Sequence, residues 1–158
     1  MKSTNDNLNH SYYMEKCLEL AKQAASLGEV PVGALIVTSQ GEIISEAHNL
    51  REIENIATAH AELIAIERAC KKLGRWRLSD CSLYVSLEPC FMCAGGIVLA
   101  RIPNVIFAAS DPKAGAVGSL INILNDKRLN HQCHVISGIC SEESSNLLKT
   151  FFKVRRKK

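Results

Sequence analysis

The sequence predicts an α/β fold in which helices cover both faces of one mixed, five-stranded sheet. Segments with helical periodicity alternate with short apolar runs in the order helix, strand, strand, helix, strand, helix, strand, strand, helix, which favours a single sheet. The chain has 158 residues, the length of one domain. Its 47% hydrophobic and 22% charged residues are typical of a globular protein. The first two strands follow each other as a hairpin, so we expect a mixed rather than a purely parallel sheet.

The first elements are a helix and a hairpin. Residues 1–10 are polar and are expected to be loose. Apolar side chains recur near a 3.6-residue period over residues 11–27, which predicts an amphipathic helix that Gly28 ends. The apolar run 32–37 suits a buried strand, and residues 43–49 return as the second strand after a short turn.

The middle of the chain contains two more helices around a strand. Residues 50–57 are polar and are expected to be irregular. A helix is predicted from Thr58, which can cap it, to about Leu73, where a glycine follows. Residues 82–87 form the third predicted strand. The next helix is predicted from Pro89 to about Ala100, because proline suits the first helical position.

The last third supplies two strands and a basic helix. Residues 105–109 are the fourth predicted strand, followed by a glycine-rich loop over Asp111–Ser119. Residues 134–137 are the fifth strand. A final helix is predicted from Glu142 to about Arg156, within a terminal basic segment that spans residues 141–158. Residues 1–158 are therefore expected to form a single domain.

The cysteine content and the N-terminus bear on the cellular compartment. Seven cysteines is an odd number, and the polar N-terminus lacks the apolar segment of a secretory signal. No apolar run approaches the roughly 20 residues of a membrane span. We therefore expect a soluble cytoplasmic protein with reduced thiols and no membrane contact. In that compartment a close cysteine pair indicates metal binding or catalysis rather than a disulfide. A net charge of only +3 does not by itself indicate a nucleic-acid-binding protein.

Two predicted helix starts carry metal-binding side chains. His60 lies in one, and Cys90 and Cys93 form a Cys-x-x-Cys pair in the other. Free N–H groups and the helix dipole at a helix start favour thiolate, the form that binds metals. Three ligands with one open position are typical of a catalytic zinc site. Each motif by itself has a simpler interpretation. A lone histidine in a first helical turn is usually structural, and a lone Cys-x-x-Cys can be a redox pair or two buried thiols.

Glu62 follows His60 by two residues and is the candidate proton carrier. On a regular helix that spacing is about 200° of rotation, but at a helix start both side chains can reach the same cleft. A carboxylate beside metal-bound water can take its proton and deliver it to a leaving amine. Glu62 does not form a capping box with Thr58, because Ala61 occupies the third position after it. The alternative to a proton carrier is that Glu62 is simply a solvated helix residue.

At these residues the sequence resembles the cytidine/deoxycytidylate deaminase superfamily, whose known signature is His-x-Glu followed by Pro-Cys-x-x-Cys. The resemblance implies that His60, Cys90 and Cys93 bind one Zn²⁺ per subunit and that Glu62 is the general acid/base. It also implies a three-layer α/β/α sandwich with a five-stranded mixed sheet, which agrees with the periodicity.

Further segments are similar to the bacterial tRNA-specific adenosine deaminase family. These segments are Glu29–Ala34, Thr58–Glu62, Leu87–Gly95, Asp111–Leu120, Asn130-His131 and Phe151–Lys153. The resemblance implies a hydrolase that converts adenosine to inosine at the wobble position of the tRNA anticodon. Zinc-bound hydroxide would attack C6, Glu62 would move the protons and ammonia would leave. It also implies binding of the tRNA anticodon stem-loop and a homodimer.

The resemblance extends to residues that would contact the substrate. Asn49 matches the asparagine that hydrogen-bonds the target base, and an amide offers both a donor and an acceptor; a strand-end turn residue is the alternative. The full set of expected substrate contacts is Asn49, Asp111, Lys113, Asn130, Phe152 and Arg156.

The terminal segment supports RNA binding from its own residues. One helical face is apolar, and the other carries Lys149, Lys153, Arg156 and Lys157, which suits a phosphate backbone. Phe152 is available to stack on an unpaired base. The alternative is that cations near a helix C-terminus simply favour its dipole.

Two other functions compete with this interpretation. A deaminase of free guanine or cytosine would share the metal motifs, but it would not need the basic terminal helix or the Asp111–Leu120 loop. The second competing function is that of a zinc-stabilised RNA-binding module without catalysis. The presence of Glu62 argues against it, because a purely structural metal site needs no carboxylate beside an open position.

Overall fold

The computed structural model describes residues 8–156. The expectation that residues 1–10 are loose lies mostly outside the described residues, as do the last two lysines of the basic segment. His10 already belongs to the first helix. The elements are α1 (His10–Ser26), β1 (Gly33–Thr38), β2 (Ile43–His48), α2 (Arg51–Glu54), α3 (Ala61–Leu73), β3 (Cys81–Leu87), α4 (Phe91–Ala100), β4 (Asn104–Ala109), the 3-10 helix η1 (Ile123–Asn125), β5 (His134–Ser137) and α5 (Ser141–Arg156).

The five strands form one mixed sheet in the order β2-β1-β3-β4-β5. β1 is antiparallel to both β2 and β3, whereas β3, β4 and β5 are parallel. The register places Leu35 opposite Tyr84 and Tyr84 opposite Ile106, so these side chains share one face. The expected α/β fold with a five-stranded mixed sheet is confirmed.

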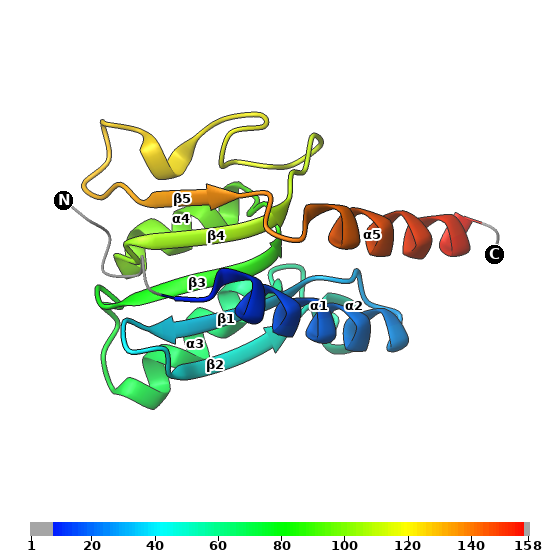
Figure 1. The fold of residues 1–158 in the computed structure, drawn as a ribbon, viewed down its shortest axis with the longest axis horizontal. Coiled ribbons are helices and arrows are strands. Elements are labelled where there is room, and N and C mark those ends of the chain that lie inside the picture. The colour runs from blue at the N-terminus through cyan, green and yellow to red at the C-terminus, as the bar shows by residue number, and fades with distance from the viewer. Residues whose placement is uncertain (1–7, 157–158) are drawn as a thin grey trace.

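The helices cover both faces of the sheet, as Figure 1 shows. On one face α1 packs over Leu35, Val37, Tyr84 and Ile106. The alternate strand residues face α3 and α4 and belong to the larger apolar core. α5 also lies on the α1 side, but it extends beyond the ends of the strands (Figure 1). Ser144 is its one buried residue.

The N-terminus of α3 lies later than the sequence predicts. Thr58 is the expected cap, but α3 begins at Ala61 and its N-cap is His60. The cause is a long-range hydrogen bond, in which the Ala61 N–H donates to Asn49 Oδ1 at 2.8 Å. This contact satisfies a free N–H of the helix start without Thr58. The predicted cap is therefore wrong, and the His60 ring makes no capping hydrogen bond.

The start of α4 shows the same kind of shift. Pro89 is the expected first helical residue, but α4 begins at Phe91 with Cys90 as its N-cap. The Pro89 carbonyl oxygen accepts a hydrogen bond from the Ala116 N–H at 2.9 Å. Pro89 therefore belongs to the connection between β3 and α4, which the glycine-rich loop contacts through this hydrogen bond.

Residues 50–57 are not wholly irregular, because they contain α2. Four helical residues are too few to show a periodic pattern. The Ile53 N–H donates to Glu29 Oε1 at 2.6 Å, and Glu29 is 1% exposed. A buried carboxylate distant in sequence therefore helps to hold this short helix. Among residues 8–156, no helix has both the length and the apolar character needed to cross a membrane.

Replacing Gly33 by alanine is expected to destabilise the fold by about 1–3 kcal/mol, the usual range for overpacking. An added Cβ would overlap the Cys17 carbonyl oxygen and Leu20 Cβ of α1, which lies directly against β1 here. Urea denaturation measures the change. Gly95→Ala is the control, because its Cβ would meet nothing within 4 Å. A wild-type free energy of unfolding in Gly33→Ala would refute the close approach.

Candidate metal and catalytic site

Two helix N-termini converge on one side of the sheet and carry the predicted metal ligands. His60 is the N-cap of α3, Cys90 is the N-cap of α4, and Cys93 lies in the first turn of α4. Gly96 lies where α3 and α4 pack together, and a Cβ there would lie 2.7 Å from Leu63 Cδ2, the end of a flexible side chain. The ligand positions therefore depend on how α3 packs against α4.

The three side chains have the geometry of a zinc site. The Sγ atoms of Cys90 and Cys93 each lie 3.6 Å from His60 Nδ1, and all three atoms lie within 4.8 Å of one another. A tetrahedral zinc with Zn–S of about 2.3 Å and Zn–N of about 2.0–2.1 Å requires an S···N separation of about 3.6 Å. The donor set fits zinc and leaves one coordination position for a non-protein ligand.

The two thiols differ in acidity. Hydrogen bonds from the Cys93 thiol and from His60 lower the pKa of Cys90 to about 4, although burial opposes the shift. The same hydrogen bond to Cys90, together with burial, raises the pKa of Cys93. Hydrogen bonding to Cys90 also raises the pKa of His60. One thiolate is thus already favoured at neutral pH, which is the form that a dication binds.

Glu62 lies beside these ligands and is 4% exposed. Burial raises the pKa of its carboxyl to about 7, against the opposing effect of its backbone hydrogen bond and of nearby His60. A carboxyl that titrates near neutrality is suited both to accept and to donate a proton. The structure therefore brings the predicted ligands and the predicted proton carrier together, although they come from two helices.

Asn49 adjoins the same helix start and is 9% exposed. Its Oδ1 atom accepts from the Ala61 N–H, which fixes the orientation of the amide. Among the described residues no hydrogen bond occupies its Nδ2 atom. The side chain thus serves as a structural acceptor at α3, while its N–H₂ group remains available as a donor.

Glu88 has a structural role beside the candidate site that the sequence did not predict. Its carboxylate is 3% exposed and accepts hydrogen bonds from the N–H groups of Asp111, Val117 and Ser119 at 3.0–3.1 Å and from the Ser119 hydroxyl. These bonds hold its pKa below the usual value, although burial opposes the shift. Gly115 packs against the carboxylate so closely that a Cβ would overlap it.

Glu88 joins the glycine-rich loop to the metal ligands. It lies two residues before Cys90, and a bridge pairs Cys90 with Gly115 of the loop. The available sequence signal was a carboxylate at the end of an apolar strand, directly before Pro-Cys. A charged group in that place needs several donors.

The other expected substrate contacts are not gathered around the metal ligands. Asp111 Oδ1 accepts from the Lys113 and Ala114 N–H groups and so stabilises a turn, while Lys113 is exposed. Asn130 is exposed and precedes His131, whose Nε2 lies 2.7 Å from the Ile102 carbonyl oxygen, beyond the C-terminal end of α4. The structure does not bring Asn130 to the end that carries Cys90.

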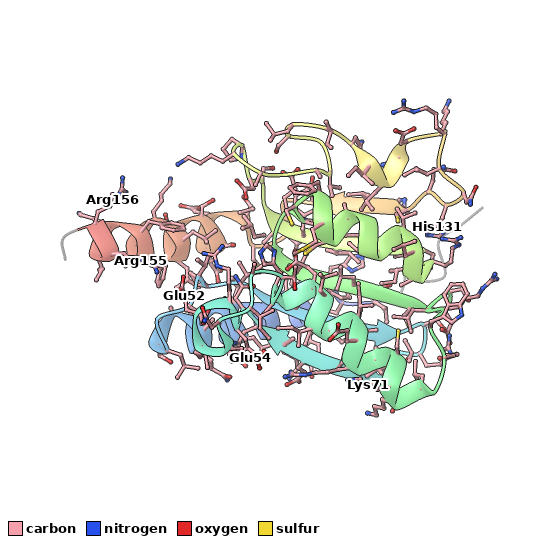
Figure 2. The ribbon with its side chains drawn as sticks, turned by 180° about the vertical axis from the view of Figure 1, so that it is seen from behind. Glu52, Glu54, Lys71, His131, Arg155 and Arg156 are labelled. Carbon is pink, nitrogen blue, oxygen red and sulfur yellow. The ribbon has the colours of Figure 1, made fainter. Side chains whose placement is uncertain are left out.

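Phe152 and Arg156 lie on the part of α5 that projects from the sheet. Phe152 is 42% exposed, and the Arg156 Nε–H donates to its carbonyl oxygen. Figure 2 shows Arg155 and Arg156 at the free end of the helix. Both expected contacts are accessible to a large ligand, and their role in binding stays a prediction.

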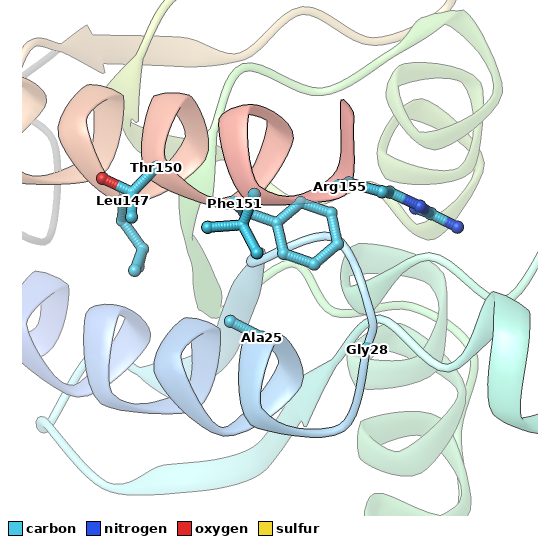
Figure 3. Close-up of a pocket in the computed structure, with 7 residues that line it drawn as sticks. Ala25, Gly28, Leu147, Thr150, Phe151 and Arg155 are labelled. Carbon is cyan, nitrogen blue, oxygen red and sulfur yellow. The ribbon is translucent and has the colours of Figure 1, made fainter. Parts of the chain in front are cut away.

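A hollow of about 410 Å³ lies between the C-terminal end of α1 and α5 (Figure 3). Ala25 and Gly28 line one side, and Leu147, Phe151 and Val154 line the other. None of the metal-binding candidates lines it, so this hollow is not the reaction site. The predicted apolar face of the terminal helix is turned toward α1.

Comparison with known proteins agrees with this geometry. The model of the MafB19-like deaminase family matches residues 8–156, which assigns the chain to the deaminases of this α/β fold. A tRNA-specific adenosine deaminase of Bacillus subtilis (strain 168) is 52% identical over 146 residues, which cover 92% of this chain and 90% of the relative. The chain belongs to the family of tRNA-specific adenosine deaminases.

Two solved structures extend the comparison. A tRNA:A34 deaminase, of a group known for A-to-I editing at the wobble position of transfer RNA, superposes with a TM-score of 0.84 at 40% identity, over 87% of this chain and 99% of that one. A guanine deaminase of Bacillus subtilis is 42% identical with a TM-score of 0.64, over 71% of each chain. The fold and much of the sequence are therefore shared with an enzyme named for a free base.

Replacing Glu88 by glutamine is expected to lower the free energy of unfolding by about 1–3 kcal/mol, the cost of leaving buried donors unsatisfied. The amides of Val117 and Ser119 should also exchange faster with deuterium, because they lose a charged acceptor. Denaturation and hydrogen exchange measure both effects. Glu54→Gln on the exposed surface is the control. Unchanged protection of the two amides would contradict the role of Glu88.

Proposed function

We propose that the protein hydrolyses adenosine to inosine at the wobble position of a tRNA anticodon, as a single deaminase domain acting in the cytoplasm, where tRNA is found. One observation carries the proposal: Glu62 is buried beside a His60, Cys90 and Cys93 triangle whose 3.6 Å separations suit zinc. Membership of the tRNA-specific adenosine deaminase family supports the choice of substrate.

His60, Cys90 and Cys93 would hold one zinc ion per subunit, and zinc in such a site supplies a water of lowered pKa as the nucleophile at C6 of the base. Glu62 would move both protons of that water, one to N1 of the base and one to the departing amine nitrogen. A C–O bond forms at C6 and the C–N bond breaks, so the products are inosine, which carries a C6 carbonyl and N1–H, and ammonia. The raised pKa of Glu62 suits it to both transfers.

Asn49 and the terminal helix supply recognition in this proposal. Among residues 8–156 no acceptor is bonded to Asn49 Nδ2, so this donor is suited to an acceptor atom of the base. Asp111 and Lys113 lie in the loop whose backbone donates to Glu88, and they would contact RNA beside the reacting base. Phe152 and Arg156, on the projecting part of α5, would contact the anticodon stem-loop by stacking and by charge. Asn130 lies at the other end of α4, so its expected contact would need RNA beyond the reacting base.

The substrate is tested with zinc-loaded protein and a tRNA transcript carrying the anticodon ACG, which places adenosine at the wobble position. Reverse transcription should read inosine there, and ammonia should not form from free guanine or cytosine. The rate at subsaturating tRNA should fall steeply as salt rises, because phosphate contacts release counterions. Ammonia from free guanine without inosine would overturn the tRNA assignment and favour a free-base deaminase.

The roles of the site residues are separated by two variants. Glu62→Ala should keep its zinc but lose turnover by about 10²–10⁴-fold, the range for general acid–base catalysis. Cys90→Ser should instead lose zinc, measured by atomic absorption after dialysis, because a thiolate ligand is removed. Full zinc content in Cys90→Ser would refute its role as a ligand, and an active Glu62→Ala would remove Glu62 from the mechanism.

We also infer that the protein forms a homodimer through the outer face of α4. Phe91, Gly95 and Leu99 follow one another at four-residue spacing, and Phe91 and Leu99 are 69% and 70% exposed. Beside them lies a hollow of about 730 Å³ that Ile121 and Leu129 help to line. A contiguous apolar surface of this kind is typical of an interface, and a two-fold contact would bury it against its own copy.

Leu99→Glu is expected to convert the protein from a mass of twice 17.3 kDa to a single chain of 17.3 kDa in light scattering at micromolar concentration. A buried unpaired carboxylate would oppose association. Leu27→Glu is the matched control, because Leu27 is an exposed leucine at the C-cap of α1, and it should leave the mass unchanged. A wild-type mass of one chain would exclude the dimer.

A further inference from the structure

We propose that the end of the molecule opposite the metal ligands is a second RNA-binding surface. This distal surface consists of Trp76 and the cations near it in the sequence, which are Lys71, Lys72, Arg75 and Arg77. It would bind the part of a tRNA outside the anticodon stem-loop. An unpaired base would stack on Trp76, and the cations would bind phosphates. The proposal rests on the proposed function, because it takes tRNA as the substrate.

Trp76 is held in solvent by a well-anchored loop. The indole is 57% exposed. Its backbone carbonyl oxygen accepts from Cys70 Sγ at 3.7 Å, and Arg75 is paired with Asp80 at 2.7 Å. Two residues later, Leu78 is fully buried, and its N–H donates to the Ala100 carbonyl oxygen at 2.8 Å. A large exposed aromatic ring on an ordered loop is suited to stacking on a base. Such stacking tolerates any sequence, because every base has a π-face.

The charges around the ring favour a polyanion. Residues 71–77 contain four cations and no acidic residue, and all four cations are exposed. The guanidinium of Arg77 lies 4.9 Å from the centre of the Trp76 ring. Asp80 is paired with Arg75, which leaves Lys71, Lys72 and Arg77 in excess. Cations combined with an exposed aromatic ring are the usual composition of a site for single-stranded nucleic acid.

The position of the distal surface indicates which part of the RNA it would meet. Thirteen residues of α3 separate His60 from Gly74, a rise of about 20 Å. α5 projects the other way, and Figure 2 shows Lys71 and His131 at one end of the molecule and Arg156 at the other. The 16 residues of α5 add about 24 Å. A stem of five base pairs, at most about 17 Å long, does not reach both ends.

The first test uses intrinsic fluorescence, because Trp76 is the only tryptophan in the sequence. Full-length tRNA with the anticodon ACG should quench its emission, and so should a full-length tRNA with another anticodon. The isolated ACG stem-loop should leave the emission unchanged. Absence of quenching by full-length tRNA, or equal quenching by the stem-loop, would overturn the proposal. A change that follows protein concentration without RNA would also overturn it, in favour of self-association.

The second test uses deamination kinetics of the zinc-loaded protein. Trp76→Ala should raise KM for full-length tRNA by about five- to a hundredfold, the equivalent of one lost base stack, with kcat unchanged. KM for the stem-loop should not change. Arg77→Ala should lower the salt slope for full-length tRNA by about 1, as expected for one lost phosphate contact.

The matched control is Tyr12→Ala. Tyr12 is also an exposed aromatic residue with a cation over its ring, since Lys16 Nζ lies 5.1 Å from the ring centre. It lies on α1, which covers the opposite face of the sheet from α3, and its loss should leave both KM values unchanged. An equal effect of Trp76→Ala on both RNAs would refute the distal contact while leaving the deaminase function intact. Absence of inosine from either RNA would instead refute the proposed function, and the fluorescence result would then decide the distal surface alone.

Discussion

The convergence of two helix N-termini is the constraint on which this structure depends. Metal binding needs three side-chain atoms within a few ångströms, and they come from α3 and α4, which follow different strands. Each helix start exposes N–H groups that must find acceptors. Asn49 supplies one for α3, and the Cys90 sulfur lies at the start of α4. The same unsatisfied donors that make a helix start costly also favour a thiolate there.

Most of the fold could be predicted from local pattern. The apolar runs of β1 and β4 are fully buried strands, β3 is buried except at Leu87, and the periodicity of residues 11–27 corresponds closely to α1. The errors lie at the helix starts. Thr58 and Pro89 have the composition of a cap and of a first helical residue, but contacts with Asn49 and Ala116 determine where the chain turns. Such contacts join residues far apart in sequence, so local propensity cannot reveal them.

The candidate site divides in the same way. The ligands could be predicted because metal chemistry restricts both residue type and spacing, and His60, Cys90 and Cys93 do meet. Glu88 could not, because its role depends on donors from Asp111, Val117 and Ser119, which only the folded chain brings to it. Asn130 shows the opposite case. It is selected by resemblance, but it lies near the C-terminal end of α4, whereas the candidate ligands lie at the N-terminal end. A residue that matches a family motif must therefore also lie close to the candidate site in the fold before it can act there.

The proposed recognition role of Asn49 would limit how base preference can change in this fold. Its oxygen stabilises the start of α3, next to His60 and Glu62, so a new side chain at position 49 would alter the candidate site as well as the proposed contact with the base. A change of preferred nucleobase through position 49 would therefore disturb the site itself. The exposed tip of the 111–120 loop and the free end of α5 have no such second role, so changes there would leave His60 and Glu62 in place.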